Sequence, residues 1–167
     1  MTTARQARYV VRPATVADAA PLGEMHVQAW RESYQGVVDQ GVLDALDGRA
    51  RGERWRQWLE QQEAPIRLFV GVDEQGRIVG MVCAGPNRDP DTPAAQELYA
   101  INVLAEAKGT GLADALLDAA VGSGSASMWV LQDNPRAHAF YARHGFAPDG
   151  SSVYDQQLHA VEVRLVR

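Results

Sequence analysis

The fold is decided by residues 97–117, which read ELYAINVLAEAKGTGLADALL. Residues 96–104 are apolar, aromatic and β-branched enough to predict a strand. A loop of small residues follows the strand. After the loop, an apolar face recurs at helical spacing through Leu112, Ala115, Leu116, Ala119 and Ala120. The segment therefore predicts a strand, a small-residue loop and a helix that begins directly after the loop.

The loop before this helix has the composition of an anion-binding site. The first turn of a helix carries unpaired N–H groups and the positive end of the helix dipole. Gly109, Gly111 and Ala113 leave that backbone open to close approach, so we expect a phosphate group to bind there. Tight helix packing is the alternative reason for the small residues.

Two familiar phosphate motifs do not match this loop. A P-loop needs Gly before its Lys and Ser or Thr after it, whereas Ala107 precedes Lys108 and Gly109 follows it. The dinucleotide fingerprint GxGxxG needs a third small residue where Asp114 stands. The loop therefore belongs to neither class.

The rest of the chain predicts a single α+β domain spanning residues 1–167. We expect further helices at 16–30, 41–61 and 135–144, and strands at 9–11, 66–72, 77–84, 127–131 and 158–166. The turn-prone residues 73–76 join two of these strands into an antiparallel hairpin. Asn134 and Pro135 begin the last helix as N-cap and first residue, and Gly145 ends it.

The composition excludes several classes of function. Sixteen Lys and Arg against 21 Asp and Glu give a net charge of −5, and no basic stripe is present, so we expect no nucleic-acid partner. The single cysteine, Cys83, and four dispersed histidines argue against a disulfide and a metal site. The chain shows no signal peptide and no apolar run of about 18 to 20 residues, so we expect a cytoplasmic protein without membrane contact.

A second motif lies about twenty residues after the first, in residues 130–146, VLQDNPRAHAFYARHGF. Together, this motif and residues 108–113, KGTGLA, resemble the GNAT superfamily of acyl-CoA-dependent N-acyltransferases. The first follows that family's signature Gln/Arg-x-x-Gly-x-Gly/Ala, with Lys108 in place of Gln or Arg. Lysine keeps a cationic donor but lacks the planar fork of arginine. The resemblance spans nearly the whole chain and implies the GNAT fold, a central mixed, mostly antiparallel sheet flanked by helices.

The resemblance implies direct transfer of acetyl from acetyl-CoA to a primary amine within one ternary complex. Backbone N–H groups of the loop would hold the pyrophosphate, Asn134 would hydrogen-bond the cofactor arm, and a backbone N–H near Val103 would polarise the thioester carbonyl. The cofactor-binding residues that it implies are Val103, Lys108, Gly109, Thr110, Gly111, Leu112, Ala113 and Asn134.

Two residues are candidates for proton transfer. Tyr141 matches the family's tyrosine that protonates the departing CoA thiolate; aromatic packing is its alternative role. The acceptor amine must lose a proton, because an amine of pKa about 10 is neutral in roughly one part in a thousand at pH 7. Glu97 is the candidate base, because simple alternation places it on one strand face with Tyr99, Ile101 and Val103. A water relay and an exposed strand-edge carboxylate are the alternatives.

The sequence defines the acceptor substrate less well than it defines acetyl-CoA. His26 and Trp30 share a helix face, and Tyr34 enters the following loop, in a region that borders the acceptor pocket in the family. We expect a small-molecule amine. A peptide or protein N-terminal amine, and a non-enzymatic acyl-CoA-binding or regulatory module, are the alternatives. The sequence does not decide between a monomer and a homodimer, and sheet-edge dimers are common in the family.

Overall fold

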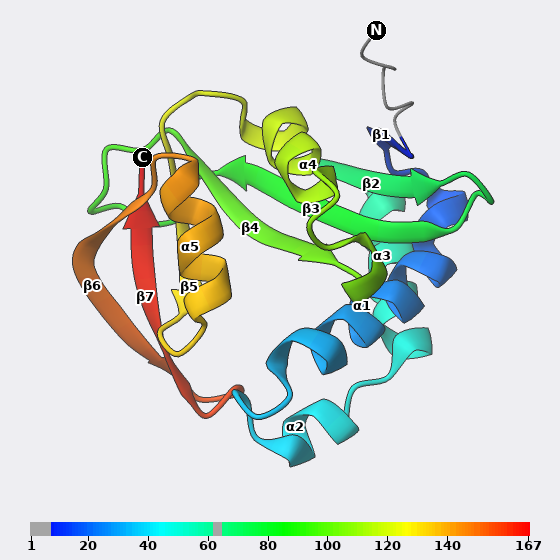
Figure 1. The fold of residues 1–167 in the computed structure, drawn as a ribbon, viewed down its shortest axis with the longest axis horizontal. Helices are drawn as coiled ribbons and strands as arrows, with labels where there is room; N and C mark the ends of the chain where they lie inside the picture. Colours follow the sequence, from blue (N-terminus) through cyan, green and yellow to red (C-terminus); the bar gives the residue numbers. More distant parts are fainter. Residues whose placement is uncertain (1–7, 62–64) are drawn as a thin grey trace, which may run out of the picture.

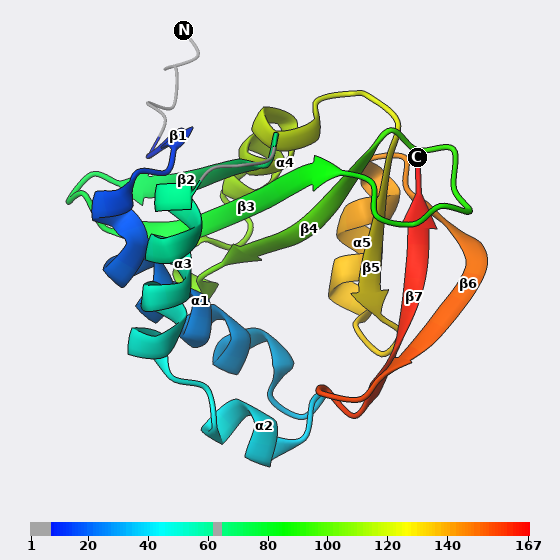
Figure 2. The same ribbon diagram turned by 180° about the vertical axis from the view of Figure 1, so that it is seen from behind.

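The computed structural model describes residues 8–61 and 65–167, which form a seven-stranded sheet with helices on both faces (Figures 1 and 2). The strands are β1 (Tyr9–Pro13), β2 (Arg67–Asp73), β3 (Ile78–Pro86), β4 (Gln96–Val103), β5 (Ala126–Leu131), β6 (Ala147–Asp155) and β7 (Ala160–Val166). The α-helices are α1 (Ala19–Tyr34), α2 (Gln40–Asp44), α3 (Gly48–Gln61), α4 (Leu112–Val121) and α5 (Pro135–Arg143). The predicted α+β class and mostly antiparallel sheet are confirmed. No helix within these residues is long and apolar enough to cross a membrane.

The sheet opens at its centre. Its strand order is β1-β2-β3-β4-β5-β7-β6, and β4–β5 is the parallel pair, whereas the other neighbours are antiparallel. Residues 96–98 of β4 pair with 126–128 of β5, and beyond them the two strands diverge (Figure 1). The edge of β4 that faces β5 therefore has no partner strand after Leu98.

Helix α4 covers the first half of the sheet, on the face opposite α1 and α3 (Figures 1 and 2). Leu112, Leu116 and Ala120 of its predicted apolar face are buried, together with Leu117, whereas Ala115 and Ala119 are exposed. Leu112 and Leu116 pack where Gly80 of β3 has no side chain: a Cβ there would lie 3.1 Å and 3.0 Å from their methyl carbons. This packing fixes the start of α4, and with it the preceding loop, against the sheet.

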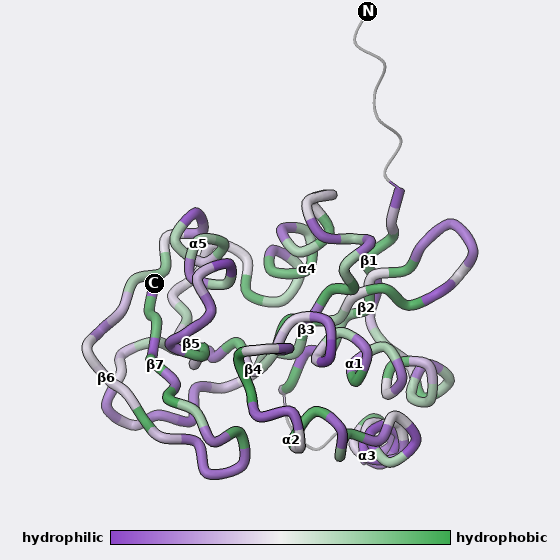
Figure 3. Tube along the Cα trace, turned by 60° about the horizontal axis from the view of Figure 1, so that its bottom comes forward, coloured by the Kyte–Doolittle hydropathy of each residue, from purple (hydrophilic) through white to green (hydrophobic). Residues whose placement is uncertain are grey.

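Three elements differ from the sequence-based expectation. The predicted helix at 41–61 is two helices, because Asp39 caps α2 through the Gly41 amide and Asp47 accepts the Ala50 amide at the start of α3. Helix α1 continues to Tyr34, which the sequence placed in a loop. Strand β6 was not predicted, since its residues are mostly exposed and mostly polar. Figure 3 shows the hydropathy of the chain along this edge of the sheet.

Helices α1 and α3 cross at a contact between two glycines. A Cβ on Gly23 would lie 2.3 Å from the Gly52 amide nitrogen and 2.4 Å from the Gly48 carbonyl oxygen. These atoms belong to the backbone of α3, which cannot turn aside as a flexible side chain can. Gly23 therefore sets the distance between the helices, although glycine is unfavourable within a helix.

A buried histidine occupies the same helix pair. The His26 ring lies 6.1 Å from the Trp30 ring and 5.9 Å from the Trp55 ring, between centroids. Its Nδ1 is buried and has no hydrogen-bond partner among the described residues. Burial, with a smaller contribution from Arg51, lowers the pKa of His26 to about 3. His26 is therefore a neutral packing residue of the α1–α3 interface near pH 7.

Gly23→Ala should destabilise the fold strongly. The added methyl overlaps the α3 backbone, so the helices must separate, and we expect a loss of about 3 kcal/mol in the free energy of unfolding. Urea unfolding measures the change, with Gln28→Ala on an exposed position of α1 as the control. Equal stability of Gly23→Ala and the control would contradict the close contact.

His26→Phe should weaken the pH dependence of stability. The folded-state pKa lies below the unfolded value of about 6.5, so the stability associated with neutral His26 is present above pH 6.5 and is lost as pH falls toward 3. Between pH 7 and pH 5, this residue should account for about 2 kcal/mol of the loss. Urea unfolding at both pH values measures this loss. If the free energy of unfolding falls by the same amount in wild type and in His26→Phe, the lowered pKa of His26 is rejected.

Candidate functional site

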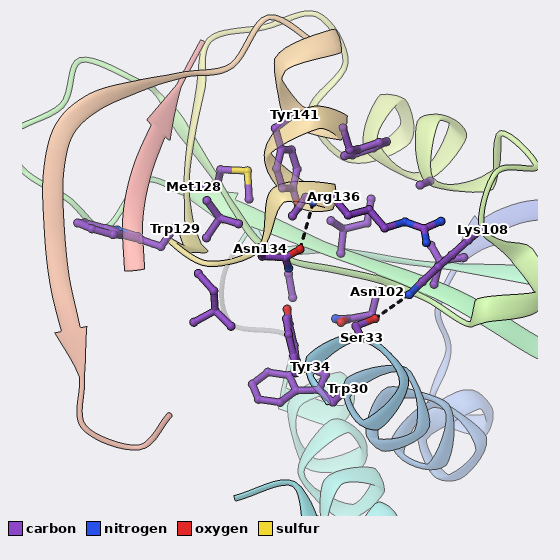
Figure 4. A pocket seen from close by; sticks show the side chains of 18 of the residues that line it. Trp30, Ser33, Tyr34, Asn102, Lys108, Met128, Trp129, Asn134, Arg136 and Tyr141 are labelled. Atoms are coloured by element: carbon purple, nitrogen blue, oxygen red, sulfur yellow. Dashed lines mark hydrogen bonds between the residues drawn. The ribbon is translucent and has the colours of Figure 1, made fainter. Parts of the chain in front are cut away.

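A cavity of about 580 Å³ fills the opening between β4 and β5 (Figure 4). Its walls come from those two strands, the last turn of α1, the loop before α4, helix α5, and the residues around the turn that joins β6 to β7. Segments far apart in the sequence therefore meet at one site. One end of the cavity lies at the start of α4 and the other near the turn before β7, and the last turn of α1 lines the cavity between them.

The predicted phosphate loop lies at the first end. Gly109 and Gly111 have φ of 75° and 90°, in the left-handed region that favours glycine, and a Cβ on either would meet no atom within 4 Å. Gly111 is the N-cap of α4 and has no side chain to cap it, and the Leu112 amide donates to Thr110 Oγ1 at 3.4 Å. The loop thus presents an open backbone beside the positive end of a ten-residue helix, as an anion site requires.

Lys108 connects this loop to α1. Its Nζ donates a hydrogen bond to Ser33 Oγ at 3.0 Å. Burial and the nearby positive charge of Arg136 lower the pKa of Lys108. The cation is therefore held at the cavity wall beside a second cation, an arrangement that suits a group with more than one negative charge.

Six of the eight predicted cofactor residues line the cavity: Val103, Lys108, Gly109, Gly111, Ala113 and Asn134. Thr110 and Leu112 do not. The Thr110 hydroxyl donates to the Ala107 carbonyl at 2.6 Å, and Leu112 packs on the sheet. The Leu112 amide already donates to Thr110 Oγ1 at 3.4 Å.

Asn134 has a second role. Its Oδ1 accepts the Ala137 amide at 3.2 Å and caps α5, as the sequence predicted. Figure 4 shows its side chain between Tyr34 and Tyr141 at the cavity wall. With Oδ1 engaged, the amide Nδ2 is the group of Asn134 available to a ligand.

Two cavity-lining arginines were missed by the sequence analysis. Arg136 and Arg143 lie seven residues apart on α5, so they share the helix face that carries Phe140. Arg143 also donates to Asp114 at 3.4 Å, across the gap between α5 and the first turn of α4. Their i, i+7 spacing was visible in the sequence, but only the fold places this face opposite Lys108.

Tyr141 is buried in the cavity wall. It is 5% exposed, and its ring packs 5.1 Å from the Phe140 ring and 5.9 Å from the Phe146 ring. Its hydroxyl makes no hydrogen bond to a residue that the structure describes. Burial raises the pKa of Tyr141 above its usual value near 10, and Tyr34 adds to the shift. The phenol therefore keeps its proton at neutral pH.

Glu97 does not line the cavity. It is 2% exposed and accepts hydrogen bonds from Arg88 Nη2 at 2.6 Å, Arg88 Nε at 3.1 Å and the Arg88 amide at 3.0 Å. The expected strand alternation fails because Ala84 pairs with Leu98 and Cys83 with Ala100, which leaves Tyr99 as an extra residue. Ala84 and Val82 lie on the same face of β3. Their partners in β4, Leu98 and Ile101, therefore lie on one face of β4.

Glu97 is consequently on the opposite face from Ile101 and Val103. Its buried carboxylate is paired with Arg88, whose side chain is 66% exposed. A catalytic role for Glu97 stays a prediction that the geometry does not support.

The second end of the cavity is mainly apolar and aromatic. Trp30 and Tyr34 line it from α1, with their rings 5.0 Å apart, and Leu158 lines it from the turn before β7. Glu162 of β7 is the carboxylate among them. His26, expected beside Trp30, does not line the cavity.

The protein comparisons agree with this architecture. The sequence model of the acetyltransferase (GNAT) family matches residues 24–146. The chain is 29% identical to the uncharacterized N-acetyltransferase YuaI of Bacillus subtilis over 90% of this chain and 89% of that protein.

Solved structures share the fold. The PaiA N-acetyltransferase of Thermoplasma acidophilum, determined in complex with coenzyme A, superposes with a TM-score of 0.71 at 14% identity, covering 93% of this chain and 97% of that one. The ribosomal-protein-alanine N-acetyltransferase of Brucella melitensis gives a TM-score of 0.72 at 20% identity, covering 95% and 98%. From its sequence match and its fold, this chain belongs to the acetyltransferase (GNAT) family of enzymes.

Proposed function

We propose that this acetyltransferase moves the acetyl group of acetyl-CoA to the primary amine of a small molecule, by direct transfer within a ternary complex. One observation carries the proposal. A single cavity joins an open glycine loop at a helix N-terminus to a buried phenol and then to an apolar, aromatic end. This order suits a donor and an acceptor that enter from different ends.

The loop and its cations fit acetyl-CoA. The open backbone at Gly109 and Gly111 would receive the pyrophosphate, and Lys108, Arg136 and Arg143 would balance its charge and that of the 3′-phosphate. The PaiA enzyme of the same fold was crystallised with coenzyme A, which agrees with this assignment. The cosubstrate would supply the activated acetyl thioester.

The unpaired edge of β4 would align the cofactor arm. Beyond Leu98, alternate backbone N–H and C=O groups of β4 face β5 across the cavity without a partner strand. An extended amide-containing chain can pair with such an edge as a strand would. A backbone N–H near Val103 would then stabilise the negative charge that develops on the thioester oxygen during attack.

Tyr141 would act as the general acid. Its raised pKa keeps the hydroxyl protonated, and a departing thiolate, whose conjugate acid has a pKa near 8.5, needs a proton. The residue can therefore donate its proton to the sulfur when the bond to the acetyl group breaks.

Tyr141→Phe should lower kcat by about 100-fold, because a general acid contributes at least that factor. The dissociation constant of acetyl-CoA should stay within about twofold, since the lost hydroxyl contributes to the departure of the thiolate. Amine-dependent CoA release and isothermal titration measure the two effects. Tyr154→Phe on exposed β6 is the control. Full activity of Tyr141→Phe would remove this residue from the acid role.

Gly111→Trp should abolish acetyl-CoA binding by filling the phosphate loop. Gly76→Trp is the matched control, because both glycines have positive φ, 90° and 81°, and open surroundings, so both substitutions strain the backbone alike. Isothermal titration should show micromolar acetyl-CoA binding by wild type and by Gly76→Trp, and no binding by Gly111→Trp. Unchanged affinity of Gly111→Trp would refute the loop assignment. A folded wild type that binds no acetyl-CoA would refute the proposed function.

A further inference from the structure

The acceptor end of the cavity contains an unpaired carboxylate. Glu162 lies on β7 opposite Leu131 of β5 and is half-buried in the cavity wall. Across residues 8–61 and 65–167, no Lys, Arg or His comes within 4 Å of its carboxylate, and no hydrogen bond satisfies it. Glu97, by contrast, is paired with Arg88. A partly desolvated carboxylate without a partner is unfavourable for stability, so a positively charged ligand group is the natural complement.

The groups around Glu162 are a phenol, a second carboxylate and apolar side chains. Burial and the negative charge of Asp155 raise the pKa of Glu162. The Asp155 carboxylate accepts the Gln157 and Leu158 amides at 2.7 and 2.9 Å and shapes the turn before β7. Glu162 is therefore a stronger base than an exposed glutamate.

Tyr34 links this carboxylate to the acid end of the site. Burial raises the pKa of Tyr34, and the charge of Glu162 adds to the shift. Tyr34 in turn contributes to the raised pKa of Tyr141. Figure 4 shows the Tyr34 hydroxyl directed toward Asn134, below Tyr141. The base, the phenols and the thioester position therefore share one cavity.

We propose that Glu162 binds the ammonium group of the acceptor and takes its proton, and that the acceptor is a primary amine on an apolar skeleton, held by Trp30, Tyr34 and Leu158. This inference rests on the proposed function and specifies its acceptor. The other carboxylates that line the cavity are already engaged, Glu32 by the Ala105 amide and Asp114 by His144 and Arg143. An aromatic wall with the one unengaged carboxylate suits an apolar body with a cationic end. A polyamine would leave its further charges unpaired against this wall.

The proton balance of the step closes. One proton of R–NH₃⁺ moves to the Glu162 carboxylate, and the amine nitrogen then forms a bond to the thioester carbonyl carbon. The C–S bond breaks, and the sulfur takes the Tyr141 proton. The second proton lost from the nitrogen restores the Tyr141 hydroxyl, and Glu162 releases its proton to solvent. The products are the amide, CoA thiol and one proton.

Glu162→Gln tests this assignment, because glutamine keeps the size and removes the negative charge and the base. The probes are n-hexylamine and 2-phenylethylamine, with spermidine as the polar comparison. For the first two, kcat/KM of the variant should fall by about 100-fold at pH 7, while acetyl-CoA affinity by isothermal titration should change less than twofold. Wild type should prefer both probes to spermidine.

The pH profile separates a base from a structural residue. In wild type, kcat/KM should fall as pH drops through the Glu162 pKa, whereas Glu162→Gln should lack this acidic limb. The groups facing this carboxylate, Tyr34 from α1 and Asp155 from β6, are unchanged in the variant. Glu162→Asp should restore part of the rate. Glu74→Gln, at an exposed turn, removes the same charge elsewhere and should match wild type.

The outcomes distinguish the two proposals. If wild type acetylates these amines and Glu162→Gln has the same kcat/KM and acidic limb, the Glu162 role is overturned while the proposed function stands. A preference for spermidine overturns the apolar acceptor. Calorimetry of each amine in the presence of CoA adds a readout without turnover. If wild type binds acetyl-CoA but neither binds nor acetylates any amine in a broad panel, both proposals fall.

Discussion

The short parallel pairing of β4 and β5 is the constraint on which the site depends. Three residues from each strand pair, and the strands then separate. The separation leaves backbone donors and acceptors of β4 without a strand partner inside the molecule, where unpaired polar groups are costly. The antiparallel pairs on either side keep both halves of the sheet rigid, so the gap cannot close by repacking. A site at this gap therefore offers a ligand hydrogen bonds that the protein itself leaves unmade.

The last turn of α1 connects the two ends of the cavity. Glu32 accepts the Ala105 amide at 2.7 Å, and Lys108 donates to Ser33, so α1 holds the segment that precedes α4. Tyr34, which follows Ser33, and Trp30, two residues before Glu32, form the aromatic wall of the cavity. Because both sets of contacts come from a single helical turn, a shift of α1 at one end must move the other. The glycine contact between α1 and α3 anchors this helix at its opposite end.

The features that the sequence predicted are those specified by neighbouring residues. The start of α4 at Leu112, the Asn134 cap of α5 and the β2–β3 hairpin follow from local spacing and capping. The features that it missed depend on distant partners. The extra residue Tyr99 in β4 is visible only in its register with β3, and it reverses the face on which Glu97 lies. Strand β6 forms because β7 pairs with it, although its own residues are polar.

The placement of charged side chains also indicates that the cavity binds a ligand. Buried Glu97 is paired with the exposed Arg88, and buried Arg164 is held by Asp89, Asp91 and Asp149. A charge that loses its partner on burial destabilises the folded state. Glu162 and Lys108 line the cavity, and neither has an ion-pair partner among residues 8–61 and 65–167. These two groups leave charge of both signs in one cavity without partners, and ligand groups of opposite charge would neutralise it.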